Sequence, residues 1–226
     1  MSGGKGAVGD RPSHGLPGRP RRAAPEVRVE QILDAAAEVL LSKGLNATTV
    51  DEIAAAAGLA KGTTYLYFRS KAQVLAALRE RSVTRMLESC DMAAAEAGPD
   101  APMIVRIERF IETVFDFTAA HAQLLYVLFH EAGMEDENEI RLARDGLLVY
   151  VRDGIANGEL VVQDPEIVVS FLVYGMEGVF AAVLDGSAGM SRDRVLKAIN
   201  GIVRALLHPV GAGGGLFEAE PGHGPL

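Results

Sequence analysis

The stretch from Thr49 to Lys71, TVDEIAAAAGLAKGTTYLYFRSK, constrains the fold more than any other part of the chain. It predicts two short helices joined by a tight turn, with a third helix starting at its end. Thr49 and Glu52 fit a capping box, in which a hydroxyl and a carboxylate satisfy free backbone amides. Gly58 suits the left-handed backbone conformation that a sharp turn between helices requires. The stretch is therefore predicted to be a helix-turn-helix.

The second helix of this motif, residues 60–68, is the predicted recognition helix. Small polar side chains and a cation at a helix N-terminus suit insertion into a DNA groove. Threonine methyls can meet a thymine methyl, and lysine can donate to guanine acceptors. The candidates for contact with base edges are Lys61, Gly62, Thr63 and Thr64, with Gly62 allowing close approach.

A further helix is predicted to start just after the motif. Ser70 and Gln73 fit a second capping box, which places Lys71 in the first turn. A lysine there opposes the helix dipole, so an anion outside the protein is expected as its partner.

The run GLAKGTTYLYFRSK resembles the TetR family of bacterial transcription regulators, and the likeness extends over about residues 26–85. Thr64 departs from the family pattern, which usually has a larger aliphatic residue there. The residues that carry the resemblance are Thr49, Ile53, Ala54, Ala57, Gly58, Lys61, Gly62, Thr63, Tyr65, Tyr67, Phe68 and Lys71.

The resemblance implies a double-stranded DNA operator, a homodimer and a small-molecule effector as partners. It also implies roles for four residues as phosphate contacts, which set register without reading sequence: Thr49, Tyr65, Tyr67 and Lys71. Either tyrosine could instead pack in the small core, and Leu66 and Phe68 are expected there.

The net charge of the chain is misleading if it is taken as a whole. Residues 1–90 hold 13 Lys+Arg and 9 Asp+Glu, whereas residues 91–226 hold 9 and 21, which together give the net charge of -8. An acidic protein would not normally be assigned to nucleic-acid binding. Because the positive part contains the helix-turn-helix, a local electrostatic footprint is expected.

Four parts of the chain are predicted: a disordered basic arm (residues 1–24), a three-helix DNA-binding domain (25–71), a helical effector-binding and dimerisation domain (72–208) and a flexible tail (209–226). The arm is rich in Gly, Pro and Arg. Its Arg19, Arg21 and Arg22 belong either to a solvated tail or to an arm that follows phosphates or enters a minor groove.

The fold class is all-α, because no strand alternation appears. One long helix is expected from Ser70 to about Ala97, and the next, residues 103–120, has apolar residues around more than one face. A short helix containing Leu124 to Phe129 and a helix ending near Gly158 follow. Asp164-Pro165 and Ser191 start the last two helices, which in the TetR family pair with those of a second copy.

The second domain offers bulky apolar side chains that could line a cavity for a small apolar effector. Plain core packing explains most of them equally well. The candidates are Phe110, Phe117, Phe129, Met134, Tyr150, Phe171, Tyr174 and Met176.

Several other classes are disfavoured. His121, His130 and Glu131 match no metal-ligand spacing, and the lone Cys90 is expected to be a buried apolar residue rather than a redox sensor. No cofactor, membrane helix or signal peptide is predicted, so a cytoplasmic protein is expected.

The predicted function is a ligand-responsive transcriptional regulator, a repressor released from a palindromic operator by a small apolar effector. The alternatives are a helical DNA-binding protein without an effector and a helical enzyme, although no set of a nucleophile and a base supports an enzyme.

Overall fold

The computed structural model describes residues 24–131, 138–184 and 189–210. Every named element in these ranges is helical, so the all-α prediction is confirmed. The elements are α1 (Pro25–Ala47), α2 (Val50–Ala56), α3 (Lys61–Tyr67), α4 (Lys71–Glu96), α5 (Met103–Tyr126), the π-helical turn η1 (Val127–Glu131), α6 (Asn138–Ala156), α7 (Pro165–Leu184) and α8 (Arg192–Leu207).

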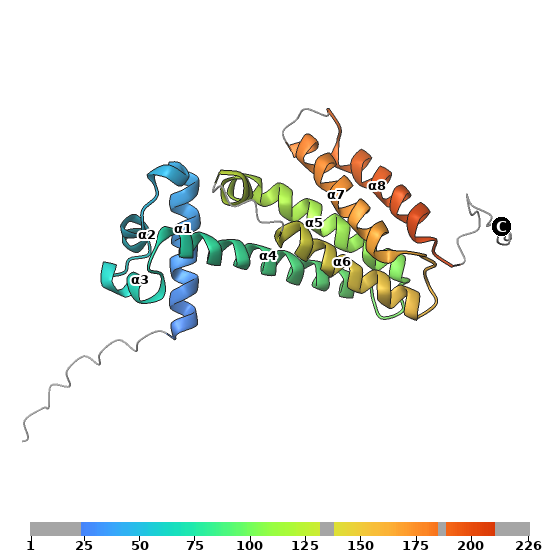
Figure 1. The fold of residues 1–226 in the computed structure, drawn as a ribbon, viewed down its shortest axis with the longest axis horizontal. Coiled ribbons are helices and arrows are strands. Elements are labelled where there is room, and N and C mark those ends of the chain that lie inside the picture. Colours follow the sequence, from blue (N-terminus) through green and yellow to red (C-terminus); the bar gives the residue numbers. More distant parts are fainter. Residues whose placement is uncertain (1–23, 132–137, 185–188, 211–226) are drawn as a thin grey trace, which may run out of the picture.

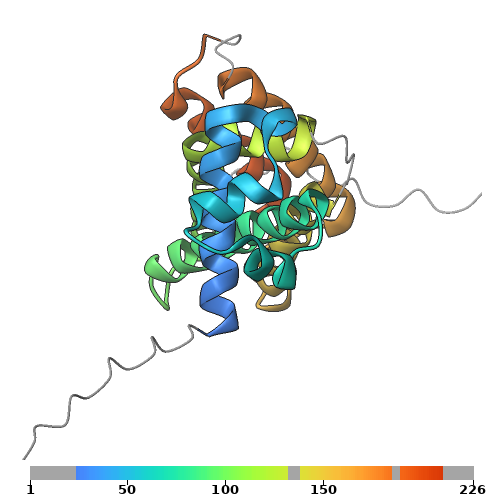
Figure 2. The ribbon, with the colours of Figure 1, turned by 90° about the vertical axis from the view of Figure 1, so that its left-hand side faces the viewer.

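Helices α1, α2 and α3 form a small unit at one end of the molecule, and α4 runs from it into the larger bundle (Figure 1). Viewed from that end, the small unit lies in front of the bundle (Figure 2). The hydrophobic residues of α1, α2 and the first turns of α4 make a common core, which includes Ile32, Leu40, Ile53, Val74 and Leu78. The predicted three-helix unit is therefore present, and the start of α4 completes its hydrophobic core.

The local signals in the sequence determine where these helices begin and end. Thr49 accepts a hydrogen bond from the Glu52 amide, and Glu52 accepts one from the Thr49 amide, which is a complete capping box. Gly58 has a φ of 65° between α2 and α3, and Gly44 has a φ of 77° within α1. Side chains other than glycine rarely adopt these values, so both glycines have a direct conformational role.

The cap of α4 differs from the predicted reciprocal capping box. The Ser70 hydroxyl accepts a hydrogen bond from the Gln73 amide at 3.3 Å. The Gln73 side chain, however, accepts from the Arg69 amide at 2.7 Å and not from the Ser70 amide. The backbone amide that the Gln73 side chain satisfies is therefore that of Arg69, one residue before the amide that a reciprocal capping box would use.

Helix α5 is the centre of the larger bundle, and it packs against α4, α6, α7 and α8. This confirms the prediction that it is buried on more than one side. The predicted break after Ala120 is wrong, because α5 continues to Tyr126 and then widens into η1. The core around α5 includes Ile107, Phe115, Leu147 and Val203.

The last helices begin where the sequence indicates. Asp164 accepts a hydrogen bond from the Ile167 amide ahead of α7, and Ser191 accepts one from the Arg194 amide ahead of α8. Pro209 and Val210, the first two residues of the predicted tail, still belong to the described fold, and the Val210 amide donates to the Glu159 carbonyl at 2.9 Å. The rest of the predicted tail, residues 211–226, lies outside the described residues. The predicted arm, residues 1–24, lies outside the described residues except for Ala24.

Helix α7 is unusually apolar for an element with a large exposed surface. Among the described residues, Pro165–Val183 is long and apolar enough to cross a membrane by length and composition, and 22% of it is buried. Ile167, Phe171 and Tyr174 are 67%, 68% and 51% exposed and follow helical spacing along one side. An exposed apolar stripe of this kind is typical of an interaction surface.

Replacing Gly154 of α6 with alanine should destabilise the protein. A Cβ atom there would lie 2.5 Å from Leu160 Cδ1 and 2.8 Å from Met103 Cγ, so the packing of α6 would have to open. We expect the free energy of unfolding to fall by about 1–3 kcal/mol in urea denaturation. Gly62→Ala is the control, because a Cβ atom there meets no atom within 4 Å. Equal stability of Gly154→Ala and the wild type would contradict this close packing.

Candidate nucleic-acid interface

The turn between α2 and α3 fixes the position of the recognition helix. The Leu59 amide donates to the Ala54 carbonyl at 2.9 Å across Gly58. The Gln31 side chain of α1 donates to the Ala57 carbonyl at 2.6 Å, so the turn is also tied to the first helix. These contacts hold α3 at a defined angle to α2, which is the basis of a helix-turn-helix.

Helix α3 has a buried side and an outward side. Thr64 and Phe68, four residues apart, are buried. Thr63 and Tyr67 are partly buried, and Tyr67 packs against the core of the small unit. The exposed residues of the helix are Lys61, Gly62, Tyr65 and Leu66.

Two expectations about this helix are wrong. Thr64 was expected to reach a base edge, but its side chain is 0% exposed and faces the core. Leu66 was expected in the core, but it is 84% exposed. A seven-residue helix has too few apolar positions for its buried side to be assigned from sequence alone. The signal for the burial of Thr64 was that the TetR family usually has a larger aliphatic residue at this position.

Asp51 of α2 connects two exposed residues of α3. Lys61 Nζ lies 2.5 Å from Asp51 Oδ2, and Tyr65 donates a long hydrogen bond of 3.4 Å to Asp51 Oδ1. Lys61 Nζ also lies 5.8 Å from the centre of the Tyr65 ring. The hydrogen bond to Asp51 raises the pKa of Lys61, so its positive charge is retained. Sequence reasoning did not identify Asp51.

The remaining expected phosphate contacts lie at the two helix starts. Thr49 is exposed, although its hydroxyl takes part in the cap of α2. Lys71 donates to the Leu45 carbonyl at 2.9 Å, so part of its hydrogen-bonding capacity binds α4 to the end of α1. The expectation that its partner lies outside the protein is therefore incomplete, because the Leu45 carbonyl already accepts a hydrogen bond from its ammonium group.

The charge of the described part of the DNA-binding region is balanced. Residues 1–23 hold five Lys+Arg and one Asp+Glu, whereas residues 24–90 hold eight of each. The excess of positive charge in residues 1–90 therefore comes from the residues before α1, and not from residues 24–90, which contain the helix-turn-helix. Two acids of α2 are moreover paired, Glu52 with Lys43 at 2.7 Å and Asp51 with Lys61. The hydrogen bond from Lys43 and then those from Thr49 lower the pKa of Glu52.

The eight candidates for an effector cavity are not brought together. Phe110 and Met176 are buried in the core around α5, with Tyr150 packed against Phe110 at a ring distance of 5.5 Å. Phe129 packs against the small unit and Phe117 stacks on His121. Phe171 and Tyr174 lie on the exposed stripe of α7, so their assignment to an interior cavity is wrong. Met134 lies outside the described residues.

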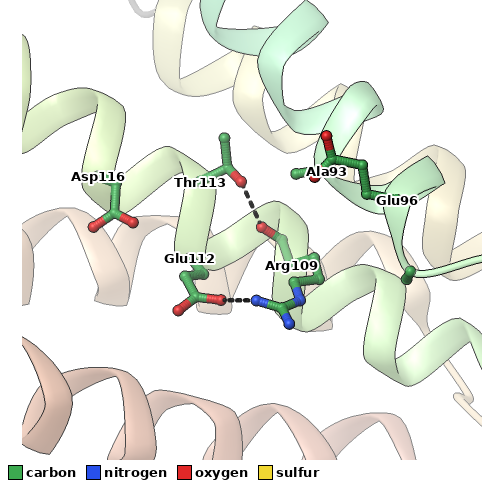
Figure 3. Close-up of a pocket in the computed structure, with 7 residues that line it drawn as sticks. Ala93, Glu96, Arg109, Glu112, Thr113 and Asp116 are labelled. Carbon is green, nitrogen blue, oxygen red and sulfur yellow. Dashed lines mark hydrogen bonds and ion pairs between the residues drawn. The ribbon is translucent and has the colours of Figure 1, made fainter.

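A cleft of about 390 Å³ lies between α4 and α5, and its lining is polar (Figure 3). Arg109 donates to Glu112 at 2.9 Å, and Thr113 donates to the Arg109 carbonyl at 2.8 Å. Arg192 of α8 binds Glu112 and Asp116 at 3.1 Å and 2.6 Å. Because its lining is polar and two of its acids, Glu112 and Asp116, are paired, this cleft differs from the cavity expected from the sequence.

The residues considered for metal or redox chemistry have ordinary environments where they are described. His121 is exposed, and its Nδ1 lies 2.9 Å from the Phe117 carbonyl oxygen. The side chains of His130 and Glu131 lie outside the described set, within which no group of three metal-ligating residues occurs. Cys90 is buried, and burial raises the pKa of its thiol to about 12. The prediction that Cys90 acts as a buried apolar residue is confirmed.

Thr64→Val should stabilise the protein. The Thr64 hydroxyl is buried and has no hydrogen-bond partner among the described residues, so the desolvation of its oxygen is not compensated. Valine keeps the shape, and we expect the free energy of unfolding to rise by about 1 kcal/mol in urea denaturation. Thr63→Val, at a partly exposed position, is the control and should change stability less. A less stable Thr64→Val variant would indicate that the hydroxyl has a partner.

Comparison with known proteins supports the assignment of α2 and α3 as a helix-turn-helix. The model of the family described as "Bacterial regulatory proteins, tetR family" matches residues 32–78, which span the helix-turn-helix. The HTH-type transcriptional repressor SCO4008 of Streptomyces coelicolor is 29% identical over 199 residues, which cover 79% of this chain and 96% of that protein. The structure of SmeT in complex with triclosan has a TM-score of 0.58 at 21% identity and covers 85% of this chain and 100% of that one, which shows the shared fold.

A further relative is similar enough to identify the family. The transcriptional regulator AcuR of Cereibacter sphaeroides is 31% identical over 175 residues, which cover 71% of this chain and 78% of AcuR. Together with the helix-turn-helix geometry of α2 and α3, this likeness over most of both chains shows that the protein belongs to the TetR family and is a DNA-binding transcriptional regulator rather than an enzyme.

Proposed function

We propose that this regulator is a homodimeric repressor that binds a near-palindromic operator and leaves it when a small molecule binds the larger domain. The observation that carries the proposal is the outward side of α3, where Lys61, Gly62, Tyr65 and Leu66 are exposed at the tip of the small unit. The N-terminal residues of a recognition helix are those that approach base edges in the major groove.

The exposed and partly exposed residues of α3 suit different contacts. Lys61 can donate to guanine acceptors, and Thr63 and Leu66 present methyl groups that can meet a thymine methyl. Thr49, Tyr65, Tyr67 and Lys71 are the proposed phosphate contacts, which position the protein on the duplex. Tyr67 combines this role with packing against the small core.

The basic arm is proposed to supply electrostatic attraction to DNA. Residues 24–90 have no net charge, whereas the arm contains Arg19, Arg21 and Arg22 directly before α1. Each phosphate that a basic residue neutralises steepens the dependence of affinity on salt. Arm contacts of this kind are known in proteins that place a basic segment in a minor groove beside the recognition helix.

The exposed stripe of α7 is proposed to pack against a second copy, together with α8. Ile167, Phe171 and Tyr174 of α7 are accompanied by Ile202 of α8, which is 51% exposed. A Cβ atom added at glycine 178 or 201 would meet no atom within 4 Å, so these small residues leave room for a partner helix. Helices α7 and α8 lie side by side at the end of the bundle away from α1–α3 (Figure 1). A two-fold axis there would present both recognition helices to one face of DNA.

Effector response requires a connection between the two domains, and η1 provides the contacts. Val127 and Leu128 belong to the same buried cluster as α1 and α4. Buried Arg79 of α4 donates to the Leu128 carbonyl at 2.6 Å and lies 5.3 Å from the centre of the Phe129 ring. A ligand that moves the end of α5 would therefore also move α1 and α4.

Such a ligand lowers the affinity for the operator only if it binds the displaced state better than the DNA-bound state. SmeT, whose structure contains triclosan, supports a small apolar effector.

The DNA-binding part of the proposal is tested by selection from a random duplex pool with the full-length chain. We expect a selected duplex with two inverted half-sites about 34–36 Å apart or at a multiple of one turn. Lys61→Met and Leu66→Ala should each weaken binding to it by about 5- to 100-fold, equivalent to one lost base contact. Fluorescence anisotropy measures the dissociation constants. Thr64→Val, a buried control, should bind as the wild type does. Undiminished binding by both variants would refute the proposed reading side of α3.

The dimer is tested by Phe171→Glu, which places a charge in the middle of the apolar stripe. We expect a monomer in sedimentation velocity at micromolar concentration, because two buried carboxylates would face each other across the axis. Affinity for the selected duplex should fall at least 100-fold when the two half-sites are no longer bound by one linked pair. Val149→Glu changes a similarly exposed apolar residue on α6 and should remain dimeric. A dimeric Phe171→Glu variant would locate the interface elsewhere.

A further inference from the structure

Asp51 is an acid on the side of the molecule that the proposed function turns toward DNA. Its carboxylate binds Lys61 Nζ with one oxygen and the Tyr65 hydroxyl with the other. These two residues lie one turn apart on α3, so one side chain of α2 spans the exposed start of the recognition helix. The Lys61 and Asp51 side chains are 64% and 49% exposed, so both are accessible to DNA.

A carboxylate at this place is unfavourable for generic attraction to DNA. It cancels the charge of Lys61, and it would repel a nearby phosphate. Acids do suit the first turn of a helix, and Asp51 lies in the first turn of α2. That role is already filled by Glu52, which completes the capping box in the same turn. The helix start therefore does not account for the contacts of Asp51 with α3.

We propose that Asp51 is a positioning and specificity residue, which holds Lys61 and Tyr65 in a fixed arrangement and penalises binding to DNA outside the operator. The inference rests on the proposed role of α3 in reading DNA. Lysine is a flexible point charge, and an unpaired Lys61 could bind whichever phosphate is nearest. Paired with Asp51, Lys61 keeps N–H donors for a base edge but loses much of its attraction to any phosphate.

The effect on specificity follows from what Lys61 and Asp51 meet on the operator and on other DNA sequences. On the operator, a correctly placed guanine acceptor binds the remaining donors of Lys61. These hydrogen bonds offset the unfavourable approach of the Asp51 carboxylate to the DNA. On other sequences the repulsion is not offset, and this is discrimination by an unfavourable contact. Exposed ion pairs have modest energies, so a change of about fivefold in the specificity ratio is expected.

The test compares Asp51→Asn with the wild type on two duplexes, the one selected from the random pool and a shuffled duplex of the same composition. Anisotropy titrations between 50 and 300 mM salt give both dissociation constants and their salt slopes. We expect tighter binding to the shuffled duplex, a salt slope steeper by about 0.9, as for one additional phosphate contact, and a specificity ratio about fivefold lower. Asp51→Glu keeps the charge and should restore the ratio to within about twofold.

A charge-matched control and a double-mutant cycle separate positioning from general electrostatics. Asp100→Asn removes one negative charge beyond the far end of α4, a helix of 26 residues and therefore about 39 Å long. It should leave the ratio and the slope unchanged. In a Lys61→Met background, Asp51→Asn should no longer lower the ratio, because Lys61, the one of the two positioned residues that reads a base edge, is absent.

The outcomes distinguish the inference from the function on which it rests. An unchanged ratio in Asp51→Asn, or the same change with and without Lys61, would overturn the role of Asp51 while leaving the reading role of α3 intact. If Lys61→Met alone binds the selected duplex as the wild type does, the proposed role of Lys61 itself fails, and the inference about Asp51 fails with it.

Discussion

Helix α4 is the constraint on which both halves of the molecule depend, because one unbroken helix contributes to two hydrophobic cores. Val74 and Leu78 pack in the core of the small unit, whereas Cys90 packs in the core around α5. Between these positions, Arg81 binds Glu30 and Asp34 of α1 at 3.0 and 2.7 Å. A rigid helix that is held at both ends cannot be displaced at one end without a response at the other.

The balance of charge in the small unit changes how its DNA recognition should be understood. With eight basic and eight acidic residues, residues 24–90 have no net charge. In the proposed function, short-range contacts at the tip of α3 distinguish DNA sequences, while the basic residues before α1 provide attraction that is independent of sequence. The proposal thus assigns sequence recognition and general attraction to DNA to different parts of the chain.

Sequence reasoning predicted the features that depend on near neighbours in the chain, such as the caps at Thr49 and Asp164 and the turn at Gly58. It failed where the answer depends on which side of a helix meets another element. Thr64 and Leu66 exchanged their expected environments because a seven-residue helix has too short a pattern to define its buried side. Phe171 and Met176 share one helix and one chemical character, yet one is exposed and the other buried, and the packing of α7 on its neighbours decides between them.

The position of α5 explains why a ligand, a partner copy and DNA could influence one another in this fold. Helix α5 contacts α7 and α8, which carry the exposed apolar stripe, and it continues without a break into η1. Leu128 of η1 then receives the hydrogen bond of Arg79 inside the core of the small unit. The interior around α5 is filled by Phe110, Phe115 and Phe180, with the last two rings packed edge to face at 4.7 Å. Because close-packed cores deform little, a ligand that enters this region would have to shift α5 as a body, and that shift would reach the proposed dimer face and η1 together.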